Sequence, residues 1–288
     1  LPMATPASPT SQAPPGAVSR AIPGVKHIIA VGAGKGGVGK TTVSVNLAIA
    51  LTKSGNRVGI IDADVYGPNV PMMLGISSQL ESDGKKIVPA EKYGIRVVSM
   101  GFLADEKAPL IWRGPMLHGV VRQFVQDVRW GELDYLVVDM PPGTGDVALS
   151  LSQTVPVSGA VVVTTPQKVS LADSRRAVAM YEKLNIPTLG IIENMSYYVC
   201  PGCEQEADLF GKGGGVQIAE ELNVPFLGQI PLCTPIRVGG DTGAPIVSVE
   251  PDSPGGQAFL QATERTVDQL SIASKKPLAP LVAPPVNK

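Results

Sequence analysis

The sequence predicts a single α/β domain with a mostly parallel sheet flanked by helices on both faces. Short apolar runs rich in β-branched residues alternate with segments of helical periodicity, which is typical of a parallel sheet. Most of these runs are continuously apolar, as expected for strands that are covered on both faces. A glycine-rich loop joins the first run to a helical segment, an order that is typical of phosphate-binding folds.

Seven strands and six helices follow from this alternation. The strands, each a short and mainly apolar run, are Ile28–Gly32, Arg57–Asp62, Ile95–Met100, Tyr135–Asp139, Gly159–Thr164, Thr188–Asn194 and Phe226–Ile230. The helices, each placed between or after these runs, are Thr41–Ser54, Met116–Arg129, Ala148–Gln153, Leu171–Leu184, Gly214–Leu222 and Gly256–Leu270. Such sheets bind ligands at the carboxyl ends of their strands, and every motif below except the cysteines lies at such an end.

Composition supports a folded domain and excludes some classes of partner. The chain has 288 residues, of which 44% are hydrophobic, enough for a substantial core. The formal net charge is −1, no Lys/Arg run is longer than two residues, and 5% of the residues are aromatic. We therefore expect no nucleic-acid partner. No apolar run approaches the roughly 18 residues of a membrane-spanning helix, so no stable membrane association is expected.

The two ends of the chain differ in composition from the middle. Residues 1–24 are rich in Pro, Ala and Ser and are predicted to form a disordered arm, as are the Pro-rich residues 273–288. Residues 25–272 carry the strand–helix alternation and form the predicted domain. Three cysteines in a chain of this length do not make a disulfide framework, which favours a reducing, cytoplasmic compartment.

A phosphate-binding loop follows the first predicted strand. The segment GKGGVGKT, from Gly34 to Thr41, fits the pattern G-x-x-x-x-G-K-[ST] between a strand and a helix. Its glycines let consecutive backbone N–H groups surround an anion, and the helix N-terminus adds partial positive charge. Lys40 is expected to reach the β- and γ-phosphates of ATP, and Thr41 to bind Mg²⁺.

The alternative for this loop is the glycine-rich turn of a dinucleotide-binding fold. That fold does not need the Lys–Thr pair, which Mg-nucleotide binding does need, so the phosphate-loop interpretation is favoured. The predicted nucleotide contacts are Gly34, Lys35, Gly36, Gly37, Val38, Gly39, Lys40, Thr41 and Thr42.

Acidic side chains follow two other predicted strands. Asp139 ends the run YLVVD, where a carboxylate near Mg²⁺ is expected. Asp62 and Asp64 follow the run VGII, and residues two apart at a strand end are expected to point to the same side. One would orient the water that attacks ATP, and the other would support the waters of the metal ion. Elsewhere this pair would be ordinary turn residues, but beside a phosphate loop the catalytic interpretation is favoured.

The loop GKGGVGKT resembles the deviant Walker A loop of the MinD, ParA and nitrogenase iron-protein ATPases. In that class an early lysine reaches across a nucleotide-sandwich dimer to the phosphates of the partner subunit, and Lys35 stands at that position. The resemblance implies a homodimer in which Lys35 acts in trans, in the manner of an arginine finger. The alternative is that Lys35 is a solvated loop residue.

Further motifs narrow the resemblance. They occur in the order KGGVGKTTVSVNLA, DADVYGPNVPMMLG, WRGPM, DYLVVDMPPGTGD, TTPQ, ENMSYYVCPGC, LFGKGGG and IPL. Together, from about Val25 to about Leu270, they resemble the Mrp/ApbC family of iron–sulfur cluster carriers. The resemblance implies an ATPase, with ATP and Mg²⁺, that takes a 4Fe-4S cluster from a donor and passes it to apo-proteins.

The same resemblance implies roles for several residues. Asp64 corresponds to the switch I aspartate that activates water, with Asp62 nearby, and Asp139 to the Walker B aspartate. Residues 141–146 correspond to switch II. Asn194 corresponds to the asparagine that reads the adenine edge, for which its amide offers a donor and an acceptor. The alternative for Asn194 is a turn residue.

Two cysteines form a C-x-x-C motif after the sixth predicted strand. Cys200 and Cys203 supply two thiolates, whereas zinc or a four-iron cluster usually takes four ligands. Two chains on a two-fold axis would supply four, and the resemblance points to a cluster bridging a dimer. Structural zinc, a redox pair and an unreactive turn remain alternatives, of which the cluster is favoured. Cys233 is predicted to be a packing residue.

Two classes of function therefore remain. The first is an ATP-hydrolysing carrier of a labile 4Fe-4S cluster. The second is a MinD/ParA-like nucleotide switch with structural zinc at the C-x-x-C dimer interface. Membrane-bound MinD proteins end in an amphipathic basic helix, and DNA-binding ParA proteins need basic surface patches. This sequence has a Pro-rich end and no obvious basic patch, so the cysteine pair favours the carrier.

Overall fold

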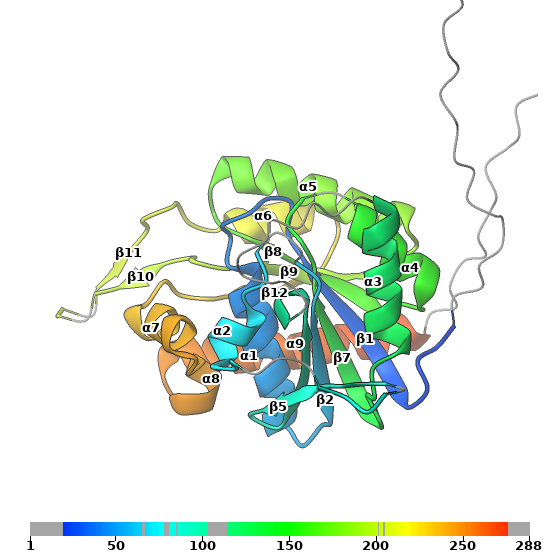
Figure 1. The fold of residues 1–288 in the computed structure, drawn as a ribbon. Helices are drawn as coiled ribbons and strands as arrows, with labels where there is room; N and C mark the ends of the chain where they lie inside the picture. Colours follow the sequence, from blue (N-terminus) through cyan, green and yellow to red (C-terminus); the bar gives the residue numbers. More distant parts are fainter. Residues whose placement is uncertain are drawn as a thin grey trace, which may run out of the picture.

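The domain is built as three layers, with one sheet between two layers of helices (Figure 1). The computed structural model describes residues 20–64, 67–77, 81–84, 86–102, 114–143, 145–200, 202–203 and 205–275. The predicted fold class, an α/β domain with a mostly parallel sheet, is confirmed.

The folded part extends beyond the predicted boundaries of 25 and 272. Ile22 is buried, and the backbone N–H of Arg20 donates to the carbonyl of Thr154. At the other end, the last helix continues to Lys275. The reason is packing: an apolar residue before the first strand closes the end of the core. The rest of the predicted arm and tail, 1–19 and 276–288, lies outside the described residues.

Among the described residues, the central sheet has eight strands in the order β12-β9-β8-β1-β7-β2-β6-β5. Its strands are β1 Val25–Gly32, β2 Val58–Asp62, β5 Ala90–Lys92, β6 Ile95–Ser99, β7 Leu133–Asp139, β8 Gly159–Thr164, β9 Thr188–Glu193 and β12 Phe226–Gln229. All neighbours pair in parallel except β5, which is antiparallel to β6. All seven predicted strands are present, and the edge strand β5 was not predicted.

In the part of the chain that the structure describes, two small hairpins lie outside this sheet. One pairs β3 Glu81–Ser82 with β4 Ile87–Val88. The other pairs β10 Tyr198–Val199 with β11 Glu206–Ala207 and extends away from the body of the domain (Figure 1). The C-x-x-C motif lies between β10 and β11, so this fold places both cysteines at a projecting tip.

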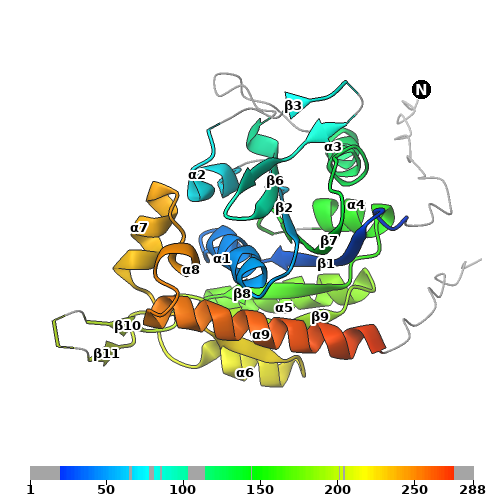
Figure 2. The ribbon, with the colours of Figure 1, turned by 90° about the horizontal axis from the view of Figure 1, so that it is seen from below.

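The helices form two layers (Figure 2). They are α1 Lys40–Lys53, α2 Val70–Leu74, α3 Gly114–Gln126, α4 Asp146–Thr154, α5 Lys168–Lys183, α6 Gly214–Glu221, α7 Thr234–Thr242, α8 Ile246–Val249 and α9 Pro254–Lys275. Helices α2, α7 and α8 were not predicted. They are short, and α7 contains Pro and two glycines, so packing rather than intrinsic propensity stabilises them.

Alternate residues of each central strand enter opposite cores, which explains the continuous apolar runs. In β1, Ile28 and Ala30 pack in the core under α3, α4, α5 and α6. Ile29 and Val31 pack in the core under α1, α8 and α9. All four are buried.

Strand β1 lies in the middle of the sheet, between β7 and β8. The chain leaves β1 through α1 and enters β2, on the far side of β7. The carboxyl end of β1 is therefore next to a point where the strand order changes direction, which is where open parallel sheets bind ligands.

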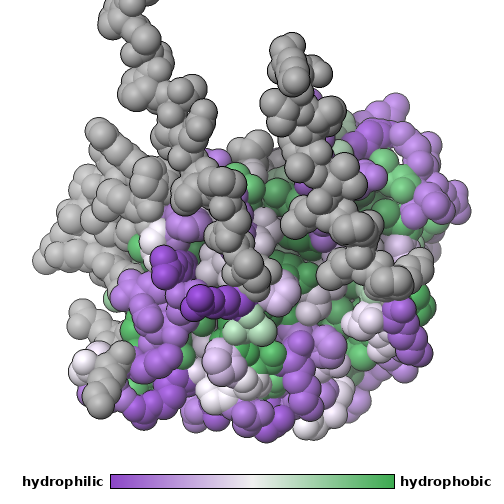
Figure 3. Space-filling view, turned by 90° about the vertical axis from the view of Figure 1, so that its right-hand side faces the viewer, coloured by the Kyte–Doolittle hydropathy of each residue, from purple (hydrophilic) through white to green (hydrophobic). Residues whose placement is uncertain are grey.

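The outer surface is mixed in character. On the face shown in Figure 3, hydrophilic and hydrophobic residues are interspersed where the surface is not covered by grey atoms. Among the described residues, no helix has both the length and the apolar composition that a bilayer-spanning helix needs.

Candidate functional site

The phosphate loop connects β1 to α1 and has the backbone geometry that its sequence predicts. Gly37 and Gly39 both have a φ of 80°, in the left-handed region that residues with a Cβ rarely adopt. Gly39 is also the residue that immediately precedes α1. The loop therefore delivers its N–H groups and the positive end of α1 to one place, which suits an anion such as a phosphate.

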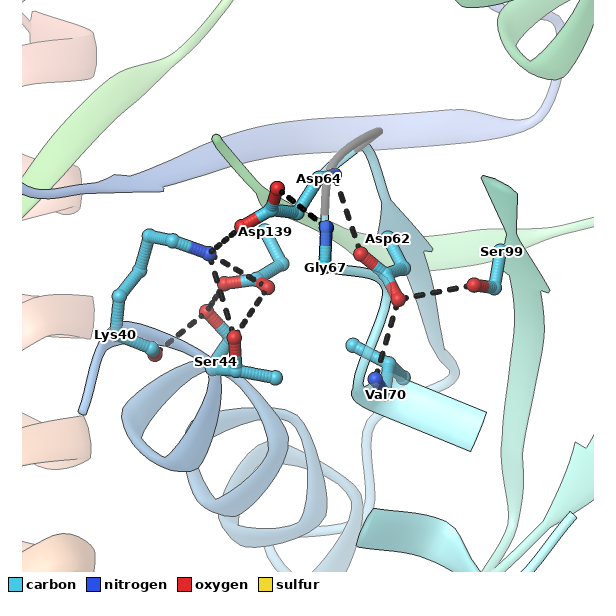
Figure 4. A network of polar contacts seen from close by, with 9 residues as sticks. Lys40, Ser44, Asp62, Asp64, Gly67, Val70, Ser99 and Asp139 are labelled. Atoms are coloured by element: carbon cyan, nitrogen blue, oxygen red, sulfur yellow. Dashed lines mark hydrogen bonds and ion pairs between the residues drawn. The ribbon is translucent and has the colours of Figure 1, made fainter. Parts of the chain in front are cut away.

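Lys40 lies in a buried network of charges at the start of α1 (Figure 4). Its Nζ is 2.8 Å from Asp139 Oδ2 and 3.7 Å from Asp64 Oδ2. The hydroxyl of Thr41 donates to Asp139 Oδ2 at 2.8 Å, and that of Ser44 donates to Asp139 Oδ1 at 2.6 Å. The structure thus brings the predicted phosphate lysine, magnesium threonine and Walker B carboxylate together.

Asp62 and Asp64 do not share one side, so that part of the prediction is wrong (Figure 4). Asp64 faces Lys40 and accepts a hydrogen bond from the N–H of Gly67 at 3.3 Å. Asp62 turns to the adjacent strand and helix instead. Strand β2 ends at Asp62, so the two-residue alternation of a strand does not continue to Asp64.

The carboxylate of Asp62 holds the loop that carries Asp64. It accepts hydrogen bonds from the N–H of Asp64 at 3.2 Å, the N–H of Val70 at 3.1 Å and the hydroxyl of Ser99 at 2.9 Å. Burial raises the pKa of Asp62, the nearby charge of Asp139 raises it further, and the three hydrogen bonds oppose these effects. Asp62 thereby fixes the start of α2 and the position of Asp64.

The first half of the phosphate loop begins packed against α5 and then becomes exposed at Gly36 and Gly37. Gly34 packs so closely on the backbone of α5 that an added Cβ would lie 2.1 Å from the carbonyl oxygen of Asp173. Lys35 is half-buried and has no hydrogen bond or ion pair within the part of the chain that the structure describes. Gly36 is exposed beside Pro142, in the predicted switch II segment. Lys35 is therefore available to a ligand or another chain.

The remaining loop residues lie where α1 begins. Val38 is buried, and the carbonyl of Thr42 accepts a hydrogen bond from the side chain of Asn46 at 2.9 Å within α1. Asn194, directly after β9, is also buried, and its Nδ2 donates to the carbonyl of Val38 at 2.9 Å. The structure thus places Asn194 against the phosphate loop, next to Gly39.

The C-x-x-C motif forms the turn of the β10–β11 hairpin. The backbone N–H of Cys200 donates to the carbonyl of Gln205 at 3.0 Å, which closes the turn. Both thiols are free, and Cys203 is exposed. N–H groups of Gly202 and Cys203, together with the Cys203 thiol, hold the pKa of the Cys200 thiol below its ordinary value. The turn therefore favours a thiolate, the form that binds metals.

Cys233 lies apart from this pair, before α7. It is half-buried, and its Sγ packs against Gly255. Burial raises the pKa of its thiol. This environment supports the predicted packing role.

The sequence did not identify several residues that shape the site. Ser44 lies one helical turn after Lys40, so helical spacing could have identified it. Tyr181 on α5 lies under Gly32, where an added Cβ would be 2.0 Å from its hydroxyl oxygen. Ser99, on β6, donates to Asp62, and the buried Glu193 ends β9 directly before Asn194, without itself bonding to the phosphate loop in the described residues. In the sequence, Glu193 is recognisable only as an acidic residue that directly follows the apolar run LGII.

Fold and site together define a class of protein. A phosphate loop after the central strand, with Lys40, Thr41 and Asp139 in contact, is the arrangement of a P-loop NTPase. The family model described as the NUBPL iron-transfer P-loop NTPases matches residues 24–267. The chain belongs to this family. The resemblance predicted from the motifs, a cluster-carrier relative within the MinD and ParA class, is confirmed.

Individual relatives agree with this assignment. An iron-sulfur cluster carrier protein of Synechocystis is 52% identical over 256 residues, which are 87% of this chain and 72% of the relative. A nucleotide-binding protein of Archaeoglobus fulgidus, solved in complex with ADP, has a TM-score of 0.70 and 37% identity over 82% of this chain and 92% of its own. The septum site-determining protein MinD of Pyrococcus horikoshii, complexed with Mg-ADP, has a TM-score of 0.64 and 26% identity over 87% of this chain and 99% of its own.

Proposed function

We propose that this chain hydrolyses ATP and carries a labile 4Fe-4S cluster, its cargo, at the interface of a homodimer, from a cluster donor to apo-proteins. The observation that carries the proposal is the pair Cys200 and Cys203, two free thiols at the tip of a projecting hairpin. The hairpin follows β9, the strand that also delivers Asn194 to the phosphate loop. The same segment of the chain would therefore hold the cluster at its tip and contact the phosphate loop at its base.

The number of thiolates supports a site shared by two chains. The described residues contain no group of three or more His, Cys, Asp or Glu side chains that could hold a metal ion. Each chain thus contributes the Cys200–Cys203 pair, and two chains on a two-fold axis contribute four thiolates, which is what a four-iron cluster takes. An exposed tip suits a cargo that has to be transferred.

Nucleotide binding rests on the network around Lys40. Lys40 would neutralise the β- and γ-phosphates, and the loop N–H groups would bind their oxygens. The oxygen atoms of Thr41 and Asp139, 2.8 Å apart, fit Mg²⁺, a hard cation that prefers such ligands. Bound there, Mg²⁺ would supply further charge neutralisation. Asn194 would read the adenine edge with its side-chain amide, whose Nδ2 donates to the carbonyl of Val38 in this structure.

Asp64 is the group that would orient the hydrolytic water. Its Oδ2 lies 3.7 Å from the Nζ of Lys40, the lysine that would bind the γ-phosphate, and Asp62 holds the backbone of Asp64 in place. Hydrolysis is expected to be slow, because proteins of this class act as switches.

Replacing Asp64 with Asn is expected to preserve ATP binding and to lower the ATPase rate by about 100-fold or more, because the water loses its orienting base. Steady-state turnover and calorimetric ATP affinity measure the two effects separately. Asp268→Asn, on the exposed side of α9, is the matched control and should leave both unchanged. Wild-type turnover in the Asp64 variant would remove Asp64 from this role.

Lys35 is expected to act on the nucleotide of the partner subunit. Lys40 already serves the phosphates in its own chain, whereas Lys35 is half-buried and unpaired within the described residues. In a mixture of Lys35→Ala and Asp64→Asn chains, a mixed dimer would assemble one site with an intact Asp64 and the intact Lys35 of the other chain. Partial recovery of ATPase activity is the expected result. No recovery, with mixed dimers demonstrated by native mass spectrometry, would favour a role in cis.

The second candidate function is a MinD-like nucleotide switch with structural zinc between two cysteine pairs. The fold shared with MinD supports it, and four thiolates also suit zinc. Anaerobic reconstitution with iron and sulfide, followed by iron, sulfide and zinc analysis and by transfer to an apo-ferredoxin, separates the two. Four irons per dimer that move to the acceptor support the carrier. Stoichiometric zinc that resists exchange for iron supports the switch.

A further inference from the structure

We propose that Glu193 is a positioning residue that ties both arms of the cysteine hairpin to the phosphate loop, so that nucleotide binding changes the geometry of the thiol pair. The outgoing arm is residues 194–199, and the returning arm is residues 206–215, which ends in the first residues of α6. The inference deepens the proposed function and rests on it for the roles of the nucleotide and the thiols.

The carboxylate of Glu193 joins the two arms at their base. Glu193 is the last residue of β9 and is fully buried. The hydroxyl of Ser196, on the outgoing arm, and the N–H of Gly215, at the end of the returning arm, both donate to it. The side chain of Gln229, at the end of β12, donates a third hydrogen bond at 3.2 Å. One side chain thus holds the exit and the return of the hairpin.

The returning arm reaches Glu193 only because its sequence is rich in glycine. A Cβ on Gly215 would lie 2.7 Å from the Cβ of Glu193, and a Cβ on Gly214 would lie 2.8 Å from the carbonyl of Pro166. Both contacts require the small residue. This explains the GGG at the end of the motif LFGKGGG: it brings the N-terminus of α6 onto a buried negative charge, which the helix dipole favours.

The other end of the link is the phosphate loop. Asn194 follows Glu193 directly, and its side chain is bonded to the carbonyl of Val38 in the loop. The backbone at this point is hydrogen-bonded to both neighbouring strands. The N–H of Asn194 donates to the carbonyl of Thr164 at 2.8 Å, and the N–H of Ile230 donates to the carbonyl of Glu193 at 2.8 Å. If Val38 moves when nucleotide binds, the hydrogen bond to Asn194 would pass that movement to Glu193, the neighbouring residue.

A carboxylate is the group that this position needs. Three donors converge on Glu193, and an ionised carboxylate only accepts. A glutamine would replace one of the two accepting oxygens with an NH₂ group, which can only donate. At least one of the three donors would then face another donor and lose its acceptor. Glu193→Gln thus keeps the volume of the side chain and breaks the link between the arms.

The test uses the reduced, metal-free full chain and measures the rate at which iodoacetamide alkylates Cys200 and Cys203, with and without saturating Mg-ADP. Sedimentation is run with and without Mg-ADP, and the rates are compared at a protein concentration where the oligomeric state is the same in both, so that a change of assembly cannot cause the difference. In the wild type, Mg-ADP is expected to change the rates about fivefold or more, the usual size of a coupling between two sites. In Glu193→Gln and Ser196→Ala this change is expected to vanish, while the affinity for Mg-ADP stays close to that of the wild type.

Arg175→Gln is the matched control, because it breaks the exposed ion pair between Arg175 on α5 and Glu221 on α6 without touching Glu193. It should keep the full response to Mg-ADP. A wild type whose thiols do not respond, or variants that respond as the wild type does, would overturn the inference. If Glu193→Gln does not fold, Ser196→Ala alone decides, since it removes one donor and keeps the carboxylate. Alkylation needs no cluster, so failure to bind iron would overturn the carrier function and leave this result standing.

Discussion

Replacing Cys200 or Cys203 with Ala is expected to reduce the iron and sulfide retained after anaerobic reconstitution to the background of untreated protein. Each substitution leaves a dimer with two of its four thiolates, and a four-iron cluster held by two is not retained. The pKa of the Cys200 thiol lies below its ordinary value, so the wild-type turn presents a ready thiolate. Cys200→Ala removes this ligand. Cys203→Ala removes the second ligand and the thiol hydrogen bond that helps to lower the pKa of Cys200. Iron, sulfide and visible absorbance measure the result.

The two cysteine substitutions are expected to affect cluster binding and not nucleotide binding. No hydrogen bond or ion pair joins either thiol to the phosphate loop within the described residues, so the affinity for ATP should stay unchanged. Cys233→Ala is the matched control: Cys233 packs against Gly255, away from the hairpin, and its loss should leave both iron and ATP binding intact. A full iron content without both Cys200 and Cys203 would exclude the hairpin as the cargo site.

Replacing Lys40 with Ala is expected to weaken ATP binding roughly 100-fold. The estimate follows from about 1.5–3 kcal/mol for a hydrogen bond to a charged group, with tenfold in affinity for each 1.4 kcal/mol. Asp139 adds to the loss, because it is completely buried 2.8 Å from the Lys40 ammonium and would keep only Mg²⁺ as a neighbouring cation. Isothermal calorimetry at a temperature where the variant is folded measures the change.

The same substitution is expected to destabilise the fold. Removing one partner of a buried ion pair costs about 3–5 kcal/mol, and among the described residues the hydroxyls of Thr41 and Ser44 would remain as side-chain partners of Asp139. Lys53→Ala, at the exposed end of the same helix, removes one positive charge without touching the network and should change neither property. Unchanged ATP affinity in a folded Lys40 variant would show that Lys40 is not the phosphate partner.

Much of the site could be predicted because its signals are local. The loop from Gly34 to Thr41 is contiguous, and the carboxyl ends of β1 and β7 meet because neighbouring parallel strands run in the same direction. The contact of Lys40 and Thr41 with Asp139 follows from these two facts. Strand–helix alternation predicted the sheet for a similar reason: a strand that is buried on both faces must be apolar throughout.

Other features could not be predicted because they depend on where the chain turns. Asp62 and Asp64 separate because β2 ends at Asp62, and the alternation of side chains ends with it. Helices α2, α7 and α8 are too short and too poor in intrinsic propensity to be visible without the surface on which they pack. The antiparallel strand β5 pairs at an edge, where a short and partly polar run is sufficient.

By itself the sequence determined the fold class, the phosphate loop with its lysine and aspartate, and the family to which the chain belongs, since each is written in contiguous residues or in a fixed strand–helix order. The tertiary structure alone decided what surrounds Glu193. Its three donors come from Ser196, Gly215 and Gln229, which are up to 36 residues distant in sequence. A buried carboxylate takes whichever donors the packing of separate elements brings to it, and no local pattern specifies that set.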